Sequence, residues 1–162
     1  MLDTLKATPA FADCTISELE KVAQICDRIT VKKGEQLFEP DHPADTVYVV
    51  VNGAIELRFY AIYYNEPQPV PVARLFKGDL IGWSALSEGG HFTLAALALQ
   101  NSELLRMRGD ELQRLCADNH HFGYVVQRNV AAIIARRFAL VLKMLISIVQ
   151  DSFKRREPGS GA

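Results

Sequence analysis

The chain has 162 residues, a formal net charge of −1, and 49% hydrophobic against 23% charged residues. This length suits one domain with a complete hydrophobic core, and the composition is that of an ordinary globular protein. The near balance of charges excludes a global field that would hold nucleic acid or an anionic membrane, although it leaves room for a local charged patch.

The N-terminus and the cysteines indicate where the protein is located and which kinds of site it lacks. The first residues lack the basic start and continuous apolar core of a signal peptide. The most apolar stretch, residues 138–149, is interrupted by Lys143 and is shorter than the roughly 20 residues that span a bilayer, so we expect a cytoplasmic protein. Cys14, Cys26 and Cys116 form no C-x-x-C pair, which favours core residues and predicts neither a disulfide framework, a metal site nor a cofactor.

The first clear element is a short helix over residues 16–25. Thr15 and Glu18 stand at the spacing of a capping box, in which each side chain accepts from the backbone of the other residue. Leu19 and Val22 follow at helical spacing.

After Asp27 the apolar residues fall in short runs separated by turn residues. The runs 46–51 and 54–60 are separated by Asn52 and Gly53, and an Asn-Gly pair between two such runs predicts a β-hairpin. Residues 61–70 contain Asn and two prolines, so we expect a loop there. Further short strands are expected at 29–31, 37–38, 72–76, 79–83, 92–99 and 103–107. This spacing indicates an all-β sandwich, roll or barrel.

From Asp110 the helical period returns, first in a short helix and then in a long one over residues 121–153. The long helix carries a heptad seam, alternating four and three residues apart, at Val130, Ile134, Phe138, Val141, Leu145 and Ile148. This seam has three possible partners: the chain's own β-region, a membrane surface, or a second copy in a parallel homodimer. The heptad spacing favours the homodimer.

Four segments follow from these elements. We predict an N-terminal helical leader at 1–26, a β-region that holds a ligand at 27–108, C-terminal helices including the dimerisation helix at 109–153, and a disordered tail at 154–162.

This order of elements resembles the cyclic nucleotide-binding domain family, whose members include bacterial catabolite activators and protein kinase A regulatory subunits. The resemblance implies a mainly β fold with flanking helices: a double-stranded β-helix, or jelly-roll-like β-roll, followed by a long dimerisation helix. The segments that carry it are TISELEKV (15–22), VKKGEQL (31–37), DTVYVVVNGAIEL (45–57), KGDLIG (77–82) and ARRF (135–138).

In this family a short phosphate cassette holds the ligand. A one-turn helix presents backbone N–H groups to the cyclic phosphate, an arginine neutralises it, and a glutamate accepts from the ribose 2′-hydroxyl. Here the corresponding segment departs from the pattern. Trp83 stands at the glutamate position, the arginine position falls at His91, Phe92 or Thr93, and no arginine occurs between Arg74 and Arg106.

The resemblance therefore implies a degenerate ligand site formed by Gly82, Trp83, Ser84, Ala85, Leu86, His91, Phe92 and Thr93. Two positions of the long helix that touch the base in catabolite activators are the apolar Val141 and Leu142. Trp83 either floors a pocket for an apolar ligand or plugs the former site. The backbone donors of Ser84 and Ala85 could survive, but the charge recognition is lost.

The histidines have competing interpretations. His91 either supplies a cation to an anionic ligand or is an exposed turn residue. The adjacent pair His120 and His121 either reaches a metal or haem, or begins a solvated helix. Adjacent side chains point in different directions, which favours the second interpretation. No enzyme signature is present, since G-x-S-x-G, P-loop and H-E-x-x-H motifs are all missing.

Two functions from different classes fit these patterns. The first is a regulatory sensor in which a small effector other than cAMP or cGMP shifts the helices of a homodimer and so the state of a partner protein. The second is a dimerisation scaffold that binds protein partners without a small ligand. Residues 151–162 are too few for the DNA-binding domain of transcription-factor relatives, so we expect no direct nucleic-acid binding, and no membrane binding.

Overall fold

The computed structural model describes residues 1–154 and divides the chain into two compact units, with the boundary after Val130. Unit 1 holds the strands and the short helices, and unit 2 begins within the long C-terminal helix. Among residues 1–154 there is no helix whose apolar length suffices to cross a membrane.

The leader consists of α1 (Leu2–Lys6), the 3-10 turn η1 (Pro9–Phe11) and α2 (Ile16–Gln24). The predicted capping box is confirmed. The Thr15 hydroxyl accepts from the Glu18 N–H at 3.3 Å, and the Glu18 carboxylate accepts from the Thr15 N–H at 2.8 Å. Leu19 and Val22 are buried, so the amphipathic face of α2 packs inward as its spacing predicts.

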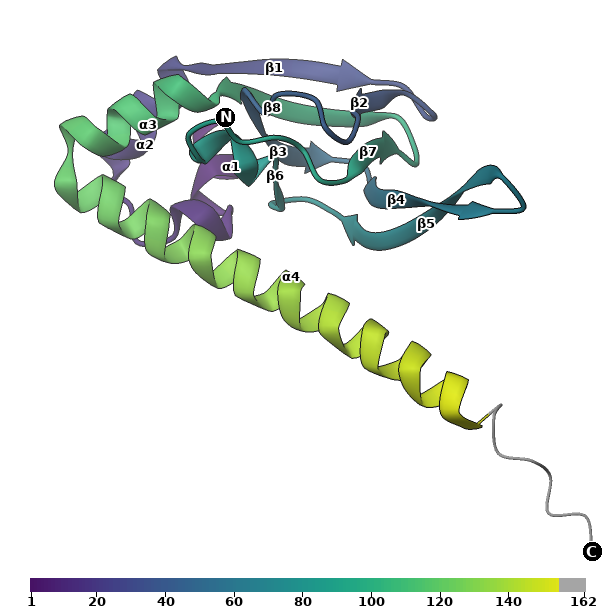
Figure 1. The fold of residues 1–162 in the computed structure, drawn as a ribbon. Helices are drawn as coiled ribbons and strands as arrows, with labels where there is room; N and C mark the ends of the chain where they lie inside the picture. Colours follow the sequence, from purple (N-terminus) through teal and green to yellow (C-terminus); the bar gives the residue numbers. More distant parts are fainter. Residues whose placement is uncertain (155–162) are drawn as a thin grey trace, which may run out of the picture. The chain divides into compact units, whose positions relative to one another are not determined.

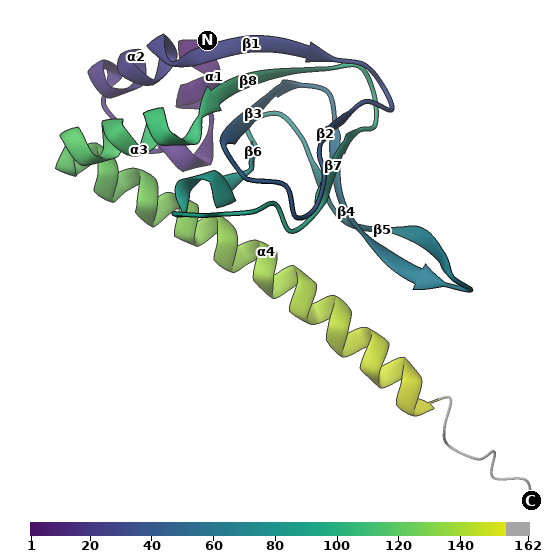
Figure 2. The same ribbon diagram turned by 45° about the horizontal axis from the view of Figure 1, so that its top comes forward.

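Within the described residues, eight strands form two antiparallel four-stranded sheets that face each other as a roll (Figure 2). The sheet orders are β1-β8-β3-β6 and β2-β7-β4-β5. The strands are β1 (Cys26–Val31), β2 (Gln36–Phe38), β3 (Thr46–Asn52), β4 (Ile55–Tyr63), β5 (Glu66–Leu75), β6 (Leu80–Ile81), β7 (Ala95–Ala98) and β8 (Ser102–Arg108). This arrangement confirms the β-roll expected from the sequence.

The core of the roll is built from inward-facing residues of both sheets. Val50, Ile81 and Leu104 from one sheet and Ile55 and Ala96 from the other are fully buried in one cluster. Because successive strand residues point to opposite faces, the alternating pattern of the sequence places these residues inside.

The Asn52-Gly53 pair does not close a hairpin, and the prediction of one is wrong. β3 lies in the first sheet and β4 in the second, so the chain changes sheets at this turn. Only Gly53 has a positive φ, at +103°, whereas a two-residue type I′ hairpin needs two such residues. A Cβ on Gly53 would lie 2.1 Å from the Ser102 hydroxyl, so the glycine is required by the close approach of β8.

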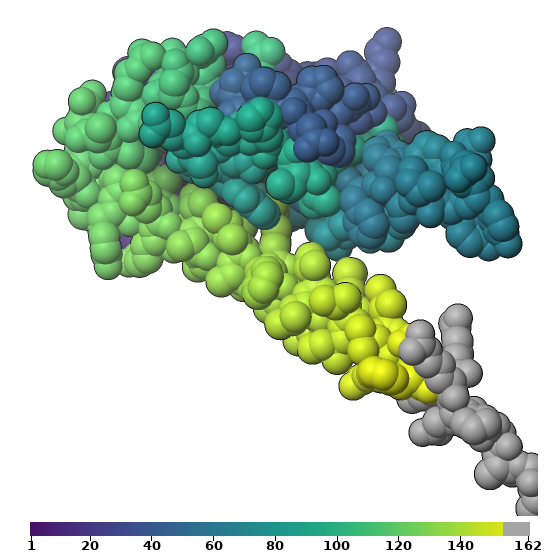
Figure 3. All heavy atoms as spheres, viewed as in Figure 1, coloured from purple at the N-terminus to yellow at the C-terminus, as the bar shows by residue number. Residues whose placement is uncertain are grey.

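The loop predicted at residues 61–70 is also wrong, because β4 and β5 continue through it as a long hairpin (Figure 1). The turn is made by Tyr64 and Asn65, with φ of +48° and +62°. Exposed aromatic residues crowd its tip, where the rings of Tyr63 and Tyr64 meet edge to face at 4.5 Å. The side chains of this hairpin stand out from unit 1 in the space-filling view (Figure 3).

Prolines are tolerated in β5 because it is an edge strand. Pro67, Pro69 and Pro71 alternate along β5 and pair with residues of β4, its single neighbour. A proline whose nitrogen faces the open side of an edge strand removes no hydrogen bond from the ladder. The prolines and the asparagine of residues 61–70 therefore suggested a loop, whereas the pairing register of β4 and β5 allows a strand.

Two helices follow the roll: α3 (Gly109–Asp118) and α4 (His120–Lys154). Phe122, Val125, Val126 and Val130 of α4 are buried. The boundaries predicted for the four segments stay a prediction. The predicted tail at 154–162 lies outside the described residues, apart from the backbone of Lys154 at the end of α4.

Candidate ligand-binding cassette

The segment Gly82–Thr93, called the cassette below, begins where β6 ends. Gly82 has a φ of +79°, and a Cβ there would lie 2.5 Å from the Thr46 carbonyl oxygen. The 3-10 turn η2 (Trp83–Leu86) follows directly. Glycine thus lets the chain leave the sheet sharply enough to form one helical turn.

The turn η2 is attached to the start of α3. The Ala85 carbonyl accepts a hydrogen bond of 2.9 Å from the Gln113 side chain. A Cβ on Gly109 would lie 2.4 Å from the same carbonyl oxygen, so helix and turn are in close contact. The Ala85 N–H donates to the Gly82 carbonyl at 3.0 Å, which engages one of the two backbone donors expected to face a ligand.

The second half of the cassette is held by the loop that precedes β3. Residues Pro43 and His91 form an isolated antiparallel bridge. On one side of this bridge, the Phe92 N–H donates to the His42 carbonyl at 3.0 Å, and the Asp41 N–H donates to the Phe92 carbonyl at 2.8 Å. These bonds fix the direction of each side chain in the segment.

Of the three positions at which the family's arginine could fall, only Phe92 is buried, with 6% of its surface exposed. His91 and Thr93 are exposed. The Phe92 ring stacks on Phe38 at 3.8 Å between centroids and lies 3.4 Å from the place of a Cβ on Gly82. An aromatic pair therefore fills the space beside the start of the cassette.

The remaining cassette residues are less enclosed. Ala85 is buried, whereas Trp83, Ser84 and Leu86 are half-buried. Trp83 is therefore partly accessible to solvent. Whether it floors a pocket or plugs one stays an open prediction.

Each of the seven arginines of Met1–Val130 has a carboxylate partner. Arg74, the arginine that precedes the cassette, donates from Nε to the buried Glu56 at 3.4 Å, and Arg58 donates to the other oxygen of that carboxylate. The other pairs are Arg28–Glu103, Arg106–Asp27, Arg108–Asp110, Arg114–Asp110 and Arg128–Asp13. All seven guanidinium groups are therefore engaged by carboxylates of the chain itself.

A buried carboxylate joins α2 to the start of α4. Oε1 of Glu18 lies 2.9 Å from both the Asn119 amide and Nδ1 of His121. Burial alone would raise the pKa of Glu18, but the hydrogen bonds from His121 and Thr15 outweigh it and lower the pKa to about 2. His121 thus orients a carboxylate, a role that its position beside His120 did not reveal. No group of three or more His, Cys, Asp or Glu side chains within residues 1–154 is arranged to hold a metal ion.

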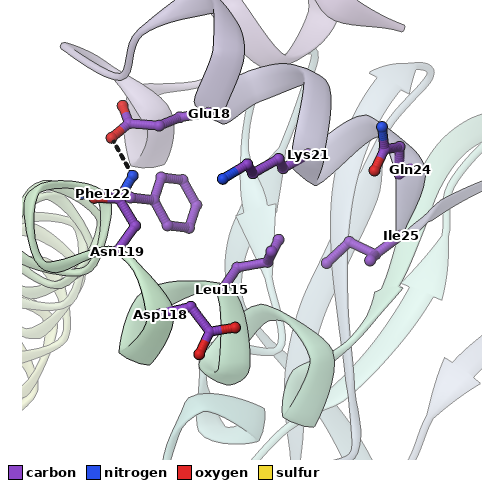
Figure 4. A pocket seen from close by; sticks show the side chains of 8 residues that line it. All are labelled: Glu18, Lys21, Gln24, Ile25, Leu115, Asp118, Asn119 and Phe122. Carbon is purple, nitrogen blue, oxygen red and sulfur yellow. Dashed lines mark hydrogen bonds between the residues drawn. The ribbon is translucent and has the colours of Figure 1, made fainter.

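A cavity of about 280 Å³ opens beside this carboxylate, between α2, α3 and the start of α4 (Figure 4). Lys21 and Asp118 supply opposite charges at its rim, while Leu115 and Phe122 form apolar walls. Its remaining lining residues are Glu18, Gln24, Ile25 and Asn119. No local sequence pattern indicates this cavity, because its lining residues come from three helices.

The cysteines are half-buried, free thiols. Burial raises the pKa of Cys14 and Cys116 to about 11 and that of Cys26 to about 12. The thiolate is the nucleophile and the metal ligand, so these groups are poorly suited to either role at neutral pH.

The predicted seam lies mostly on unit 2. Ile134, Phe138, Leu145 and Ile148 are between 39% and 66% exposed, whereas Val130 is buried in unit 1. Val141 and Leu142, the positions expected to close a ligand pocket, are 44% and 43% exposed. Their role toward a ligand stays a prediction.

Known proteins resemble this chain over most of its length. A transcriptional regulatory protein, btr, of Bordetella pertussis is 28% identical over 100 residues, which is 61% of this chain and 40% of that protein. An uncharacterized NTE family protein of Mycobacterium tuberculosis is 28% identical over 106 residues, or 65% of this chain and 17% of that protein. The chain thus spans less than half the length of these curated relatives.

The fold has a counterpart among solved structures. The catabolite activator protein of Thermus thermophilus superposes with a TM-score of 0.72 at 22% identity, covering 88% of this chain and 63% of that one. The family model of the cyclic nucleotide-binding domain matches residues 28–119, which is more than half of the sequence. The chain therefore belongs to the cyclic nucleotide-binding domain family.

Proposed function

We propose that this protein is a sensor that binds a small, neutral or weakly charged effector at the cassette and transmits its presence through α3 to the long helix of a homodimer. The observation that carries the proposal is the charge of the site. Trp83 replaces the ribose-binding glutamate, Phe92 takes the buried position beside Gly82, and every arginine of unit 1 is already paired.

The residues present do not fit a cyclic nucleotide. A cyclic phosphate that enters the roll loses its hydration, and without an opposing charge this costs several kcal/mol. An aromatic or aliphatic effector meets no such penalty, because the half-buried Trp83, Leu86 and Phe38 offer apolar surface. The site therefore favours the second class of ligand.

The contacts of Ala85 supply a route for the signal. A ligand that moves η2 also moves the Ala85 carbonyl, which accepts from Gln113 and touches Gly109 at the start of α3. Because this contact is tight, a small displacement is passed on rather than absorbed. If the helices have two arrangements, a ligand shifts the equilibrium between them only as far as it binds one arrangement more tightly than the other.

Two measurements on the purified full chain test the choice of ligand. Isothermal titration with cAMP and with cGMP should give no binding up to millimolar concentration, and native mass spectrometry should be searched for a retained small molecule. Micromolar binding of either nucleotide overturns the proposal.

A pair of variants locates the site. Trp83→Ala should abolish the thermal shift caused by a retained or screened apolar ligand. Phe76→Ala removes an exposed aromatic residue outside the cassette and should leave the shift unchanged. Equal effects of the two variants would show that the ligand binds elsewhere.

The stack of Phe38 on Phe92 favours a second candidate, a scaffold with no small ligand. A 3.8 Å stack beside Gly82 leaves no space there for another group. If the protein is such a scaffold, no ligand shifts its melting temperature. Trp83→Ala then lowers the stability of the fold, because a side chain that fills space is lost, but it leaves the number of chains in the assembly unchanged.

The homodimer is tested separately by light scattering. The seam of α4 predicts a mass of two chains or an even multiple. Replacing Leu145 in the seam by lysine should lower that mass, since a buried unpaired charge is costly. A mass of one chain for the unmodified protein would exclude the homodimer.

A further inference from the structure

The C-terminal half of α4 exposes more apolar surface than one seam contains. Eleven large apolar side chains between Ile134 and Phe153 are each at least 39% exposed. They are Ile134, Phe138, Leu140, Val141, Leu142, Met144, Leu145, Ile146, Ile148, Val149 and Phe153. Contiguous apolar surface of this kind marks an interaction site.

Nine of these residues, together with Ala135 and Ala139, form two seams, and Leu140 and Met144 lie outside both. The first seam is Ile134, Phe138, Val141, Leu145 and Ile148. The second seam follows it one residue later and also alternates four and three residues apart: Ala135, Ala139, Leu142, Ile146, Val149 and Phe153. A shift of one residue turns a helix by about 100°, so together the seams cover about half of its circumference.

Most polar residues of the same stretch lie away from the two seams. Arg136, Lys143, Ser147 and Gln150 fall within a stripe about 60° wide when projected along the helix axis. Arg137 and Asp151 lie between this stripe and the first seam, and Ser152 falls in line with the first seam. The second seam is therefore bordered by the polar stripe on one side and by the first seam on the other.

A parallel dimer through the first seam leaves the second seam exposed. A two-stranded coiled coil buries one seam per helix. The exposed part of the first seam has five positions, which is fewer than the roughly three to four heptads that typify a coiled coil. The second seam can supply the additional burial that a short coil lacks.

The second seam also indicates what covers it. Its residue sizes are mirrored about Met144. When two copies lie antiparallel, Ala135 meets Phe153, Ala139 meets Val149, and Leu142 meets Ile146.

Small residues thus face large ones at both ends of this antiparallel pairing, and residues of equal size meet at the centre. Such matching fills the space between two helices without voids or overlap. In a parallel pairing the same seam would place Phe153 against Phe153 and Ala135 against Ala135, crowding one end and leaving the other loose.

We propose that the second seam pairs antiparallel with the second seam of another copy of this chain, joining two first-seam dimers into an assembly whose smallest closed form has four chains. The inference rests on the homodimer proposed above and extends it to a second interface.

Light scattering of the full chain across a hundredfold range of concentration tests the assembly. We expect the mass of four chains at high concentration. Leu142→Glu with Ile146→Glu should reduce it to two chains. The matched control, Lys143→Glu, alters charge within the polar stripe and should leave four chains. A two-chain mass at every concentration overturns this inference but keeps the homodimer, whereas a one-chain mass overturns both.

Engineered disulfides test the orientation. The double variant Ala135→Cys with Phe153→Cys should form intermolecular disulfides under mild oxidation. Each single variant should not, because in the antiparallel pairing identical positions lie at opposite ends. Efficient cross-linking of either single variant indicates a parallel second seam and overturns the inference. The unmodified chain controls for the three native cysteines.

Lipid is the competing occupant of the second seam. If the unmodified chain, and not Leu142→Glu with Ile146→Glu, sediments with phosphatidylglycerol vesicles while its mass stays at two chains, the seam is a membrane surface and the inference fails.

Discussion

Glu18 performs two structural tasks with one carboxylate. One oxygen closes the capping box of α2 by accepting from the Thr15 N–H, and the other accepts from Asn119 and His121 at the start of α4. Because Asn119 also accepts from the Phe122 N–H at 3.1 Å, the same small network caps two helices. The capping half was predictable from the sequence, but the partner more than a hundred residues away was not.

We expect Glu18→Gln to lower the free energy of unfolding by about 1–3 kcal/mol at pH 7, because a neutral amide accepts these bonds less strongly and introduces an unneeded donor. Urea denaturation measures the loss. Glu20→Gln, at an exposed position of the same helix, is the control and should change stability little.

The same carboxylate predicts an acid dependence. Its pKa in the folded chain, about 2, lies below its ordinary value of 4.5, so its stabilising effect is complete above about pH 4.5 and declines as the pH falls toward 2. The difference in stability between the unmodified chain and Glu18→Gln should therefore shrink between pH 5 and about pH 2. A difference that is constant over that range contradicts this account.

The thiols permit a kinetic prediction. With pKa values raised to about 11 or 12, Cys14, Cys26 and Cys116 should react with a disulfide reagent at pH 8 far more slowly in the folded chain than in urea. Rapid labelling of one thiol in the folded chain would identify it as accessible and ionised.

At the scale of elements, Gly53 is decisive because the chain changes sheets there. We expect Gly53→Ala to lower the free energy of unfolding by about 3 kcal/mol, since a Cβ both strains a φ of +103° and meets Ser102. Gly34→Ala is the matched control. Its φ is +84° but nothing lies within 4 Å of the added Cβ, so only the backbone strain of about 1 kcal/mol remains. Equal losses would mean that Ser102 moves aside.

The two errors of prediction in the β-region have physical causes at this scale. Turn chemistry at Asn52 and Gly53 shows that the chain reverses direction, but not which strands pair on either side, because pairing depends on distant strands such as β8. Pro67 and Pro69 exclude a central strand but not an edge strand. The capping box of α2, a purely local signal, was predicted correctly.

At the scale of the whole molecule, unit 1 contains a closed core, both sheets and the paired charges described above. We expect residues 1–130 alone to fold and to unfold in urea as a single cooperative transition, because the buried residues of the roll find their partners inside this unit. Loss of cooperativity in this fragment would show that the remainder of α4 completes the core.

The candidate site was predictable in part. The sequence alone shows that Trp83 stands at the glutamate position and that no arginine lies nearby. The structure then places Trp83 at the start of the turn η2. Phe92 is buried and stacked on Phe38 because His42 and Asp41 hydrogen-bond to its backbone. These two partners lie about fifty residues away in the sequence. Long-range contacts of this kind leave no local pattern.

The alternating prolines of β5 have a consequence for how the molecule behaves in a crowded solution. An open strand edge is a template on which another extended chain can add and begin an aggregate, and the long hairpin of β4 and β5 carries exposed aromatic residues that would promote this. Pro67, Pro69 and Pro71 interrupt the row of N–H donors along that edge. The aromatic residues of the tip can therefore remain exposed, because another strand that adds at this edge lacks part of the hydrogen bonds that it needs.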